Sequence, residues 1–186
     1  MSNRFAGRQP CTPSHAVRDR IFDLCLAIIL SPLWFPLTFL TGVAITTTYG
    51  RPALYVSERI GKGGADFALW KFRTLDSGGK PLGRLASFLR KTHLDELPQL
   101  WNLIRGSMAL VGPRPLMRED HLSLGDLSQR ESLTPGLTGP WQLERTDKYD
   151  YSNLEALDRQ LCENRSLWFR MRIVIRTVGL MVRSLK

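Results

Sequence analysis

Two adjacent carboxylates, Asp95 and Glu96, are the residues of this chain whose types and spacing best suit chemistry. Pro98 follows them, and proline is tolerated only in the first turn of a helix, so we expect the pair near a helix N-terminus. Acidic residues are common in first helical turns because they complement the helix dipole. The pair alone therefore has a structural explanation. A functional explanation is favoured by basic residues elsewhere in the chain.

Four of these basic residues lie in apolar or Pro/Gly-rich stretches of sequence, where a solvent-exposed charge contributes little to stability. They are Lys71, Arg73, Arg90 and Arg114. Arg114 lies between two prolines, and a rigid guanidinium suits bidentate recognition of phosphate. Carboxylates beside phosphate-binding arginines indicate Mg²⁺-assisted phosphoryl transfer. His93 could act as a base or a ligand, although a lone histidine is more often structural.

Composition and absent motifs exclude several other classes of protein. The chain has 186 residues, of which 43% are apolar and 23% charged, so it can bury a core and is neither disordered nor fibrous. It lacks the P-loop, dinucleotide-binding and zincin motifs, so those enzyme classes have no support. Its net charge of +9 favours polyanionic partners. No helix-turn-helix, zinc-finger or RNP-type signature accompanies this charge, so we expect no nucleic acid among the partners.

An uncharged segment from Leu24 to Gly50 precedes these residues and spans 27 positions. As a helix it would reach roughly 40 Å, enough to cross a bilayer core. Ser31-Pro32 lies inside it, so we expect a kink or break there, with the Ser31 hydroxyl donating to a freed carbonyl. Basic residues flank both ends, and positive flanks prefer the cytoplasm. The pattern favours a re-entrant segment over a spanning helix, and a buried helix of a soluble protein is the alternative.

The last 23 residues, 164–186, contain six basic residues and no acid. On a helical projection, Arg165, Arg172, Arg176 and Arg183 form one stripe opposite an apolar side. This pattern is typical of a helix at a membrane interface, with its arginines towards lipid headgroups. A solvated basic face over an ordinary core contact explains the pattern equally well.

Between these ends the pattern predicts a small α+β unit that is mostly helical. Short apolar runs at 53–56 and 67–73, joined by a Gly-rich turn, predict a β-hairpin. Gly/Pro-punctuated loops are expected at 106–116 and 133–139. The expected helices cover residues 82–90, 95–105, 117–131 and 152–163.

The order of these motifs resembles the bacterial sugar transferase family, the monotopic polyprenyl-phosphate phosphoglycosyl transferases, in their small catalytic-core form. The resemblance covers the chain from about residue 16 to its end. Its most specific blocks are Asp-Glu-Leu-Pro-Gln at 95–99 and Gly-Pro-Arg-Pro at 112–115. The other matching pieces include Asp23, Ser31-Pro32, residues 71–74, Arg90, residues 100–102, residues 135–139, Trp141-Gln142 and residues 165–168.

This resemblance implies a reaction and a set of roles. The family moves a phosphosugar from a UDP-sugar to a polyprenyl phosphate, usually undecaprenyl phosphate, and releases UMP. The residue matching Asp95 is the nucleophile that forms a covalent phosphosugar intermediate, and the residue matching Glu96 helps to hold Mg²⁺. The candidate substrate-binding residues are Lys71, Arg73, Arg90, Arg114 and Arg145.

Two stretches depart from the family pattern. Residues 142–145 read Gln-Leu-Glu-Arg, one residue shorter than the family's Gln-Val-x-Gly-Arg. Arg170 and Arg172 occupy the start of the last helix, where family members often carry an acid. Neither departure touches Asp95 or Glu96.

Together these inferences divide the chain into four parts. They are a flexible N-terminus (1–17), a re-entrant membrane helix broken at Ser31-Pro32 (18–50), a cytoplasmic catalytic domain (51–163) and a basic amphipathic helix at the membrane interface (164–186). We expect the protein at the bacterial cytoplasmic (inner) membrane, in contact with membrane lipid, with the catalytic domain on the cytoplasmic face. The expected function is the first membrane step of glycoconjugate assembly. The alternatives are a metal-dependent phosphohydrolase of lipid pyrophosphates and a non-catalytic membrane scaffold.

Overall fold

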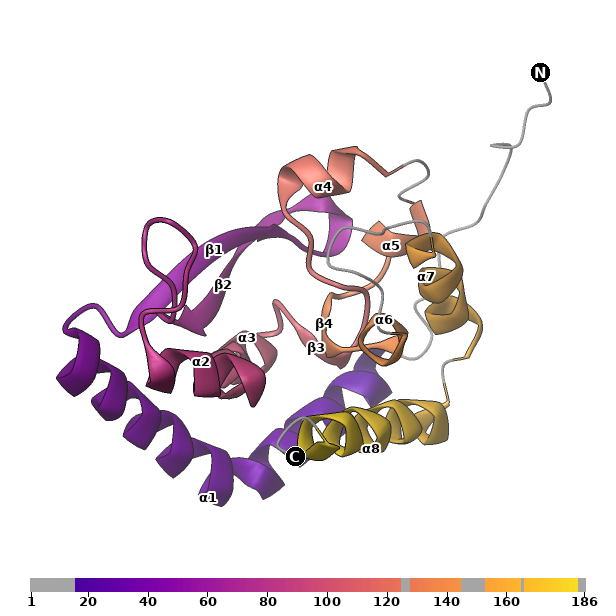
Figure 1. Cartoon of the computed structure of the whole chain (residues 1–186). Helices are drawn as coiled ribbons and strands as arrows, with labels where there is room; N and C mark the ends of the chain where they lie inside the picture. Colours follow the sequence, from indigo (N-terminus) through magenta and orange to yellow (C-terminus); the bar gives the residue numbers. More distant parts are fainter. Residues whose placement is uncertain (1–15, 125–127, 145–152, 165, 184–186) are drawn as a thin grey trace.

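Helix α1 (Ala16–Tyr49) is the longest element and runs along one side of the molecule (Figure 1). The computed structural model describes residues 16–124, 128–144, 153–164 and 166–183. Within these residues the fold is α+β and mostly helical, as expected. A β-hairpin and several short helices lie on one side of α1, and a final long helix lies beside its N-terminal part (Figure 1).

Helix α1 bends near its middle, where Pro32 and Pro36 interrupt the pattern of backbone donors (Figure 1). Pro32 has no N–H to offer the Ile28 carbonyl, and the Ser31 hydroxyl donates to that carbonyl at 2.8 Å instead. The expected kink and the expected donor are therefore confirmed. The expected break is a bend, because the chain stays helical on both sides of Ser31-Pro32.

Most of α1 is not covered by the rest of the protein. Only 17% of its most apolar 18-residue window is buried, and by length and composition the helix could cross a membrane. Its exposed apolar side chains include Ile28, Ile29, Leu30, Leu33, Phe35, Phe39, Leu40 and Val43. A core helix of a soluble protein would hide such side chains, so this exposure disfavours that alternative.

The expected hairpin is confirmed. Strand β1 (Leu54–Ile60) pairs antiparallel with β2 (Asp66–Phe72), and the short 3₁₀ turn η2 (Lys62–Gly64) joins them. Its buried side packs on α1 and α2 through a core cluster of Ile45, Phe72 and Leu89. This packing fixes β2, and with it the cations of 71–73, relative to α1 and α2.

The helix expected at 95–105 is two elements. Asp95 and Glu96 lie in a separate 3₁₀ turn, η3 (Leu94–Glu96), and the helix proper is α3 (Gln99–Arg105). Pro98 stands at the N-cap of α3, because its missing N–H and its ring prevent the helix from extending further back. Helix α2 (Arg84–Lys91) precedes the turn and agrees with the expected helix at 82–90.

A two-stranded parallel sheet lies in the segments expected to be loops. It pairs β3 (Ala109–Val111) with β4 (Gly136–Thr138). The backbones cross so closely that a Cβ on Gly112 would collide with the Thr134 carbonyl, and one on Gly136 would collide with the Gly112 backbone. Glycine at 112 and 136 is therefore required by space.

The remaining helices are α4 (Arg118–Leu122), α5 (Ser128–Glu131), α6 (Pro140–Leu143), α7 (Leu154–Glu163) and α8 (Leu167–Arg183). Of these, α8 packs on the parallel sheet, α5, α6 and α7 pack beside one another next to it, and α4 lies against β1. A core cluster of Val111, Leu133, Leu161 and Ile173 joins β3, α7 and α8. The single helix expected at 117–131 was wrong, since α4 and α5 are two short helices there.

Helix α8 carries part of the expected basic stripe. Arg172, Arg176 and Arg183 are exposed, whereas Arg165 lies outside the described residues. Its exposed apolar residues are Trp168, Ile175, Val178 and Val182. Basic and apolar side chains thus share the outer surface of α8, while its inner side is covered by the fold.

Candidate active site

Asp95 is a buried carboxylate without a partner among the residues that the structure describes. Only 6% of the residue is exposed, and it makes no hydrogen bond or ion pair with any residue that the structure describes. Burial, and then repulsion from Glu96, raises the pKa of Asp95 from its ordinary 3.8 to about 6, against attraction from Lys71, Arg90 and His93. At neutral pH the carboxylate is mostly ionised, so its oxygens are available for nucleophilic attack.

Apolar residues on both sides anchor the turn that carries the two acids. Leu94 and Leu97 pack against the cluster of Ile45, Phe72 and Leu89. Since these contacts hold the flanking residues in the core, the intervening acids have a fixed position between α2 and α3.

His93 turns the chain between α2 and η3. It has a positive φ of 58°, and its N–H donates to the Arg90 carbonyl at 3.3 Å. This backbone position gives the lone histidine a structural role, although its charge also lowers the pKa of Asp95.

Lys71 and Glu96 form an ion pair that joins the hairpin to this turn. Lys71 Nζ lies 2.7 Å from Glu96 Oε1, and their side chains are 29% and 31% exposed. The structure thus brings together three residues that the sequence singled out, Lys71, Asp95 and Glu96. The pair is open enough to water for an anionic substrate to compete for the lysine.

The other two cations near the turn differ from each other. Arg90 is exposed on α2 and acts on Asp95 through its charge. Arg73 donates to the carbonyls of Tyr49, Gly50 and Pro52 at 2.8, 3.0 and 2.8 Å, and so caps the C-terminal end of α1. Its donors are directed at backbone, a structural role that the sequence did not indicate.

Arg114 is held in a cradle of its own. Its guanidinium carbon lies 5.4 Å from the centre of the Trp141 ring, and Trp141 Nε1 donates to the Gly112 carbonyl at 3.1 Å. The Arg114 carbonyl accepts a hydrogen bond from Arg130, which is paired with buried Asp158 at 2.6 Å. Both the backbone and the side chain of Arg114 are therefore fixed, as its position between prolines predicted.

The structure does not join every expected site residue. Among the described residues, no hydrogen bond or ion pair links Arg114 to Asp95 or Glu96. Arg145 lies outside the described residues. Sequence reasoning assigned no role to Trp141, Arg130 and Asp158, and only Trp141 had a signal, since it belongs to a motif of the resemblance.

The residues present suit Mg²⁺ in one particular way. The described part of the chain contains no group of three or more His, Cys, Asp or Glu side chains that could hold a metal ion. Mg²⁺ is commonly bound by one or two carboxylates together with substrate phosphates, which does not require such a group. The adjacent carboxylates of Asp95 and Glu96 fit that mode.

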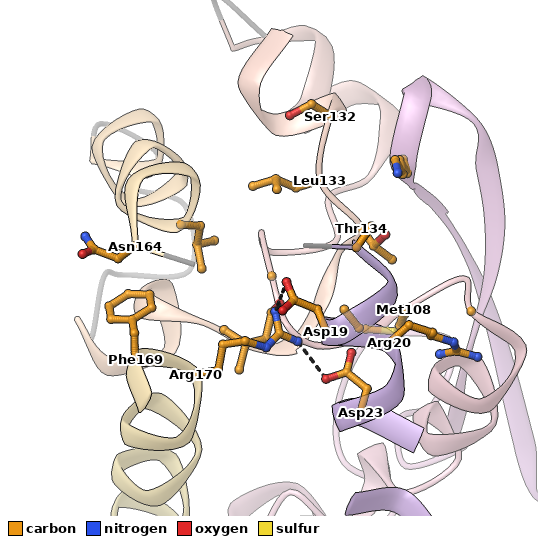
Figure 2. Close-up of a pocket in the computed structure, with 17 residues that line it drawn as sticks. Asp19, Arg20, Asp23, Met108, Ser132, Leu133, Thr134, Asn164, Phe169 and Arg170 are labelled. Carbon is orange, nitrogen blue, oxygen red and sulfur yellow. Dashed lines mark hydrogen bonds and ion pairs between the residues drawn. The ribbon is translucent and has the colours of Figure 1, made fainter. Parts of the chain in front are cut away.

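A cavity of about 110 Å³ lies elsewhere, between the start of α1, β3 and the start of α8 (Figure 2). Arg170 and Asp23 meet in it, with Arg170 Nη2 donating to Asp23 Oδ1 at 2.7 Å, and Asp19 lies 3.5 Å from Arg170 (Figure 2). The Leu110 N–H donates to the other oxygen of Asp23 at 3.1 Å. None of the described residues expected in catalysis lines this cavity. Its charged side chains pair with one another and join α1 to α8, so we assign it a structural role.

A family model described as bacterial sugar transferase matches residues 14–184. The chain is 31% identical to a UDP-galactose-lipid carrier transferase of Erwinia amylovora, covering 88% of this chain and 40% of that protein. It is 34% identical to a UDP-glucose:undecaprenyl-phosphate glucose-1-phosphate transferase of Caulobacter vibrioides, covering 87% and 68%. It is 33% identical to the exopolysaccharide production protein ExoY of Rhizobium meliloti, covering 89% and 86%. The chain thus spans less than half of the first relative and most of the third.

Proposed function

Because the chain belongs to the bacterial sugar transferase family, we propose that it is a phosphoglycosyl transferase. It moves a phosphosugar from a UDP-sugar to undecaprenyl phosphate or another polyprenyl phosphate and releases UMP. The names of its relatives, which include UDP-sugar donors and the undecaprenyl-phosphate acceptor, support this reaction. The observation that carries it is Asp95, a buried carboxylate that has no hydrogen bond within the described part of the chain and lies beside an ion pair that an anion can open.

In the first step an oxygen of Asp95 attacks the sugar-proximal phosphorus of the UDP-sugar. The new O–P bond forms as the bond from that phosphorus to the bridging oxygen breaks, and the electron pair leaves with UMP. The product is an acyl phosphate that carries the sugar on Asp95. Attack by an ionised carboxylate needs no proton transfer, which agrees with a pKa of about 6.

In the second step a phosphate oxygen of the lipid attacks the same phosphorus. The bond to Asp95 breaks, the carboxylate is regenerated, and a polyprenyl diphosphate sugar is released. Donor and acceptor therefore need not be bound at the same time, which suits an enzyme whose two substrates come from water and from lipid.

The surrounding charges stabilise the phosphates. Lys71 and Arg90 supply positive charge beside Asp95, and Arg114 supplies a fixed guanidinium on its loop. Glu96, with Asp95 beside it, is the residue that would hold Mg²⁺. Mg²⁺ held there would supply positive charge to neutralise the diphosphate.

The membrane arrangement belongs to the same proposal. Helix α1 enters and leaves the bilayer from the cytoplasmic side, with its bend at Ser31-Pro32 deepest in the lipid, and α8 lies at the interface. The uncovered apolar sides of α1 support this, as does the Ser31 hydrogen bond that satisfies the Ile28 carbonyl without water. Basic residues before and after α1 support two cytoplasmic ends.

Thiol labelling tests this topology. Single cysteines at Arg8 and at Lys62, in a chain without its native cysteines, should both be protected from a membrane-impermeant reagent in whole cells. Labelling of one position alone would establish a spanning helix.

The reaction is tested by UMP release from the full-length protein in detergent or nanodiscs. The assay contains Mg²⁺, undecaprenyl phosphate and a panel of UDP-glucose, UDP-galactose and UDP-N-acetylgalactosamine. We expect sustained UMP release that requires both a UDP-sugar and the lipid phosphate. Sustained release without the lipid would indicate a hydrolase, and no release with any donor would favour a scaffold.

A further inference from the structure

Asn102 in α3 is a buried side chain to which the proposed function gives no role. Only 3% of the residue is exposed. Its Nδ2 donates to the Ala68 carbonyl at 2.6 Å, and its Oδ1 accepts the Trp70 N–H at 3.1 Å. Both bonds reach the edge of β2 that does not face β1.

These two bonds copy the pattern of a neighbouring parallel strand. In such a ladder one residue bonds the carbonyl before, and the N–H after, the residue opposite it. The amide of Asn102 does this opposite Leu69, which is 1% exposed. One side chain therefore takes the place of a third strand and satisfies two backbone groups on the open, partly buried edge of the hairpin.

Residues that directly follow α3 also hold Asn102 in place. Its Nδ2 donates to Ser107 Oγ at 3.1 Å, and the Asn102 carbonyl accepts the N–H groups of Gly106 and Met108 at 3.0 and 3.1 Å. Asn102 thus ties the C-terminal end of α3 to the middle of β2.

We propose that Asn102 is a positioning residue, whose bonds to β2 hold Lys71 against Glu96. Lys71 directly follows Trp70 on β2, and Glu96 lies in η3, the turn that leads into α3, so the tie joins β2 to the helix that continues from Glu96. If the tie is lost, β2 keeps its packing on α1 and α2 but loses its link to α3, so the 2.7 Å contact between Lys71 and Glu96 is held less closely. The functional half of this inference rests on the proposed function of Lys71 and Glu96.

The tie itself is tested without an activity assay. Hydrogen exchange of the Trp70 amide should become at least tenfold faster in Asn102→Ala, because its acceptor is gone. The matched control is Ser107→Ala, which removes a bond to Nδ2 but leaves both bonds to β2, so exchange at Trp70 should be unchanged. Unchanged exchange in Asn102→Ala would overturn the inference.

A double-mutant cycle with Lys71→Met tests the consequence for catalysis. With the fastest donor of the UDP-sugar panel, Asn102→Ala should lower kcat/KM at least tenfold in the native background, mainly through kcat. In the Lys71→Met background it should cost less than threefold, because the residue being positioned is already absent. Losses that multiply in full would mean that Asn102 does not act through Lys71 and would overturn the inference.

Two further variants keep the outcomes distinct. If Asn102→Ala does not fold, Asn102→Asp keeps the acceptor for Trp70 and loses the donors to Ala68 and Ser107, and it should show the same dependence on Lys71. If Lys71→Met retains native kcat/KM, the role proposed for Lys71 fails, and with it the catalytic consequence of the tie. The exchange experiment still decides whether the tie exists.

Discussion

Asp23 and Asp95 are both buried aspartates, with 2% and 6% of their surfaces exposed, yet their surroundings are opposite. Asp23 accepts hydrogen bonds from Arg170 and from the Leu110 N–H, one on each oxygen. Asp95 has no hydrogen bond among the described residues, and its nearest charges include a second carboxylate. The cost of burying the Asp23 charge is offset by hydrogen bonds, whereas no described hydrogen bond offsets the cost of burying Asp95.

The difference shows how the same residue type serves structure and chemistry. A buried charge with a guanidinium and an N–H as partners holds elements together. A buried charge without partners costs stability, and folds keep such groups where they perform a reaction. Asp158, which is buried and paired with Arg130, follows the pattern of Asp23. Asp95 does not follow this pattern, and the proposed reaction accounts for the exception.

The largest expected effect is the loss of UMP release when Asp95 is replaced. Asp95→Asn keeps the side-chain volume but removes the proposed nucleophile, so UMP release should fall by about 10³-fold or more. With UDP-sugar alone, the native protein should release up to about one equivalent of UMP and gain a phosphosugar on the Asp95 peptide. Intact-protein mass spectrometry after rapid quench measures both, and the variant should show neither. Absence of the native adduct, with UMP only when lipid phosphate is added, would favour single-step transfer.

Removing the partner of Asp23 should lower the stability of the fold. Arg170→Met leaves the Asp23 charge buried without its main partner, which should lower the free energy of unfolding by about 3–5 kcal/mol. Thermal or chemical denaturation in detergent measures this. Arg172→Met is the matched control, since Arg172 is exposed on the same helix and should change stability by less than about 0.5 kcal/mol. Equal effects of the two variants would remove the distinction between the two aspartates.

Arg114→Lys should lower the rate of UMP release by roughly 30–150-fold, which corresponds to about 2–3 kcal/mol of lost contact. Lysine keeps the charge but not the planar fork that the Trp141 ring supports. Steady-state kinetics of UMP release measures the loss. Near-native kinetics would show that the fixed guanidinium does not bind phosphate.

The smallest effect is on the pH dependence of stability. Because the pKa of Asp95 is about 6 in the folded protein and ordinarily 3.8, the folded state holds this proton more tightly. The stability from this group is therefore full below pH 3.8 and is lost as pH rises through 6. Asp95→Asn should accordingly stabilise the protein at pH 7.5 by about 2 kcal/mol, and by little at pH 4.

Denaturation at the two pH values measures this gain. UMP release by the native protein should fall as pH drops through about 6, since Asp95, the proposed nucleophile, becomes protonated. A gain in stability that is the same at both pH values would mean that Asp95 ionises normally.

The parts of the fold that local pattern specifies were predictable. The hairpin, α2 and the kink of α1 each follow from apolar periodicity, glycine or proline within a few residues. The sheet of β3 and β4 was not predictable in this way. Each strand has three residues, and Ala109 pairs with Gly136 far along the chain, so no short window signals the pairing.

The candidate site divides in the same way. Asp95 and Glu96 were found because adjacent acids before a proline form a local signal. Arg73 was expected to bind substrate, but its guanidinium reaches carbonyls at the end of α1, a contact that only the folded chain creates. The Arg130–Asp158 support of Arg114 likewise joins separate helices and has no local signature.

The first residues of α1 bond to partners that are synthesised much later in the chain. Arg20 caps α3 through the Leu103 and Ile104 carbonyls, 83 and 84 residues later, and Asp23 meets Arg170 147 residues later. At translation rates of about 5–20 residues per second, Asp23 waits roughly 7–30 s for that arginine. In the proposed membrane arrangement, lipid covers the apolar sides of α1 during this interval. On the proposed topology, the fold is completed around a helix that is already inserted, and the proposed active site is confined to the surface that supplies the lipid acceptor.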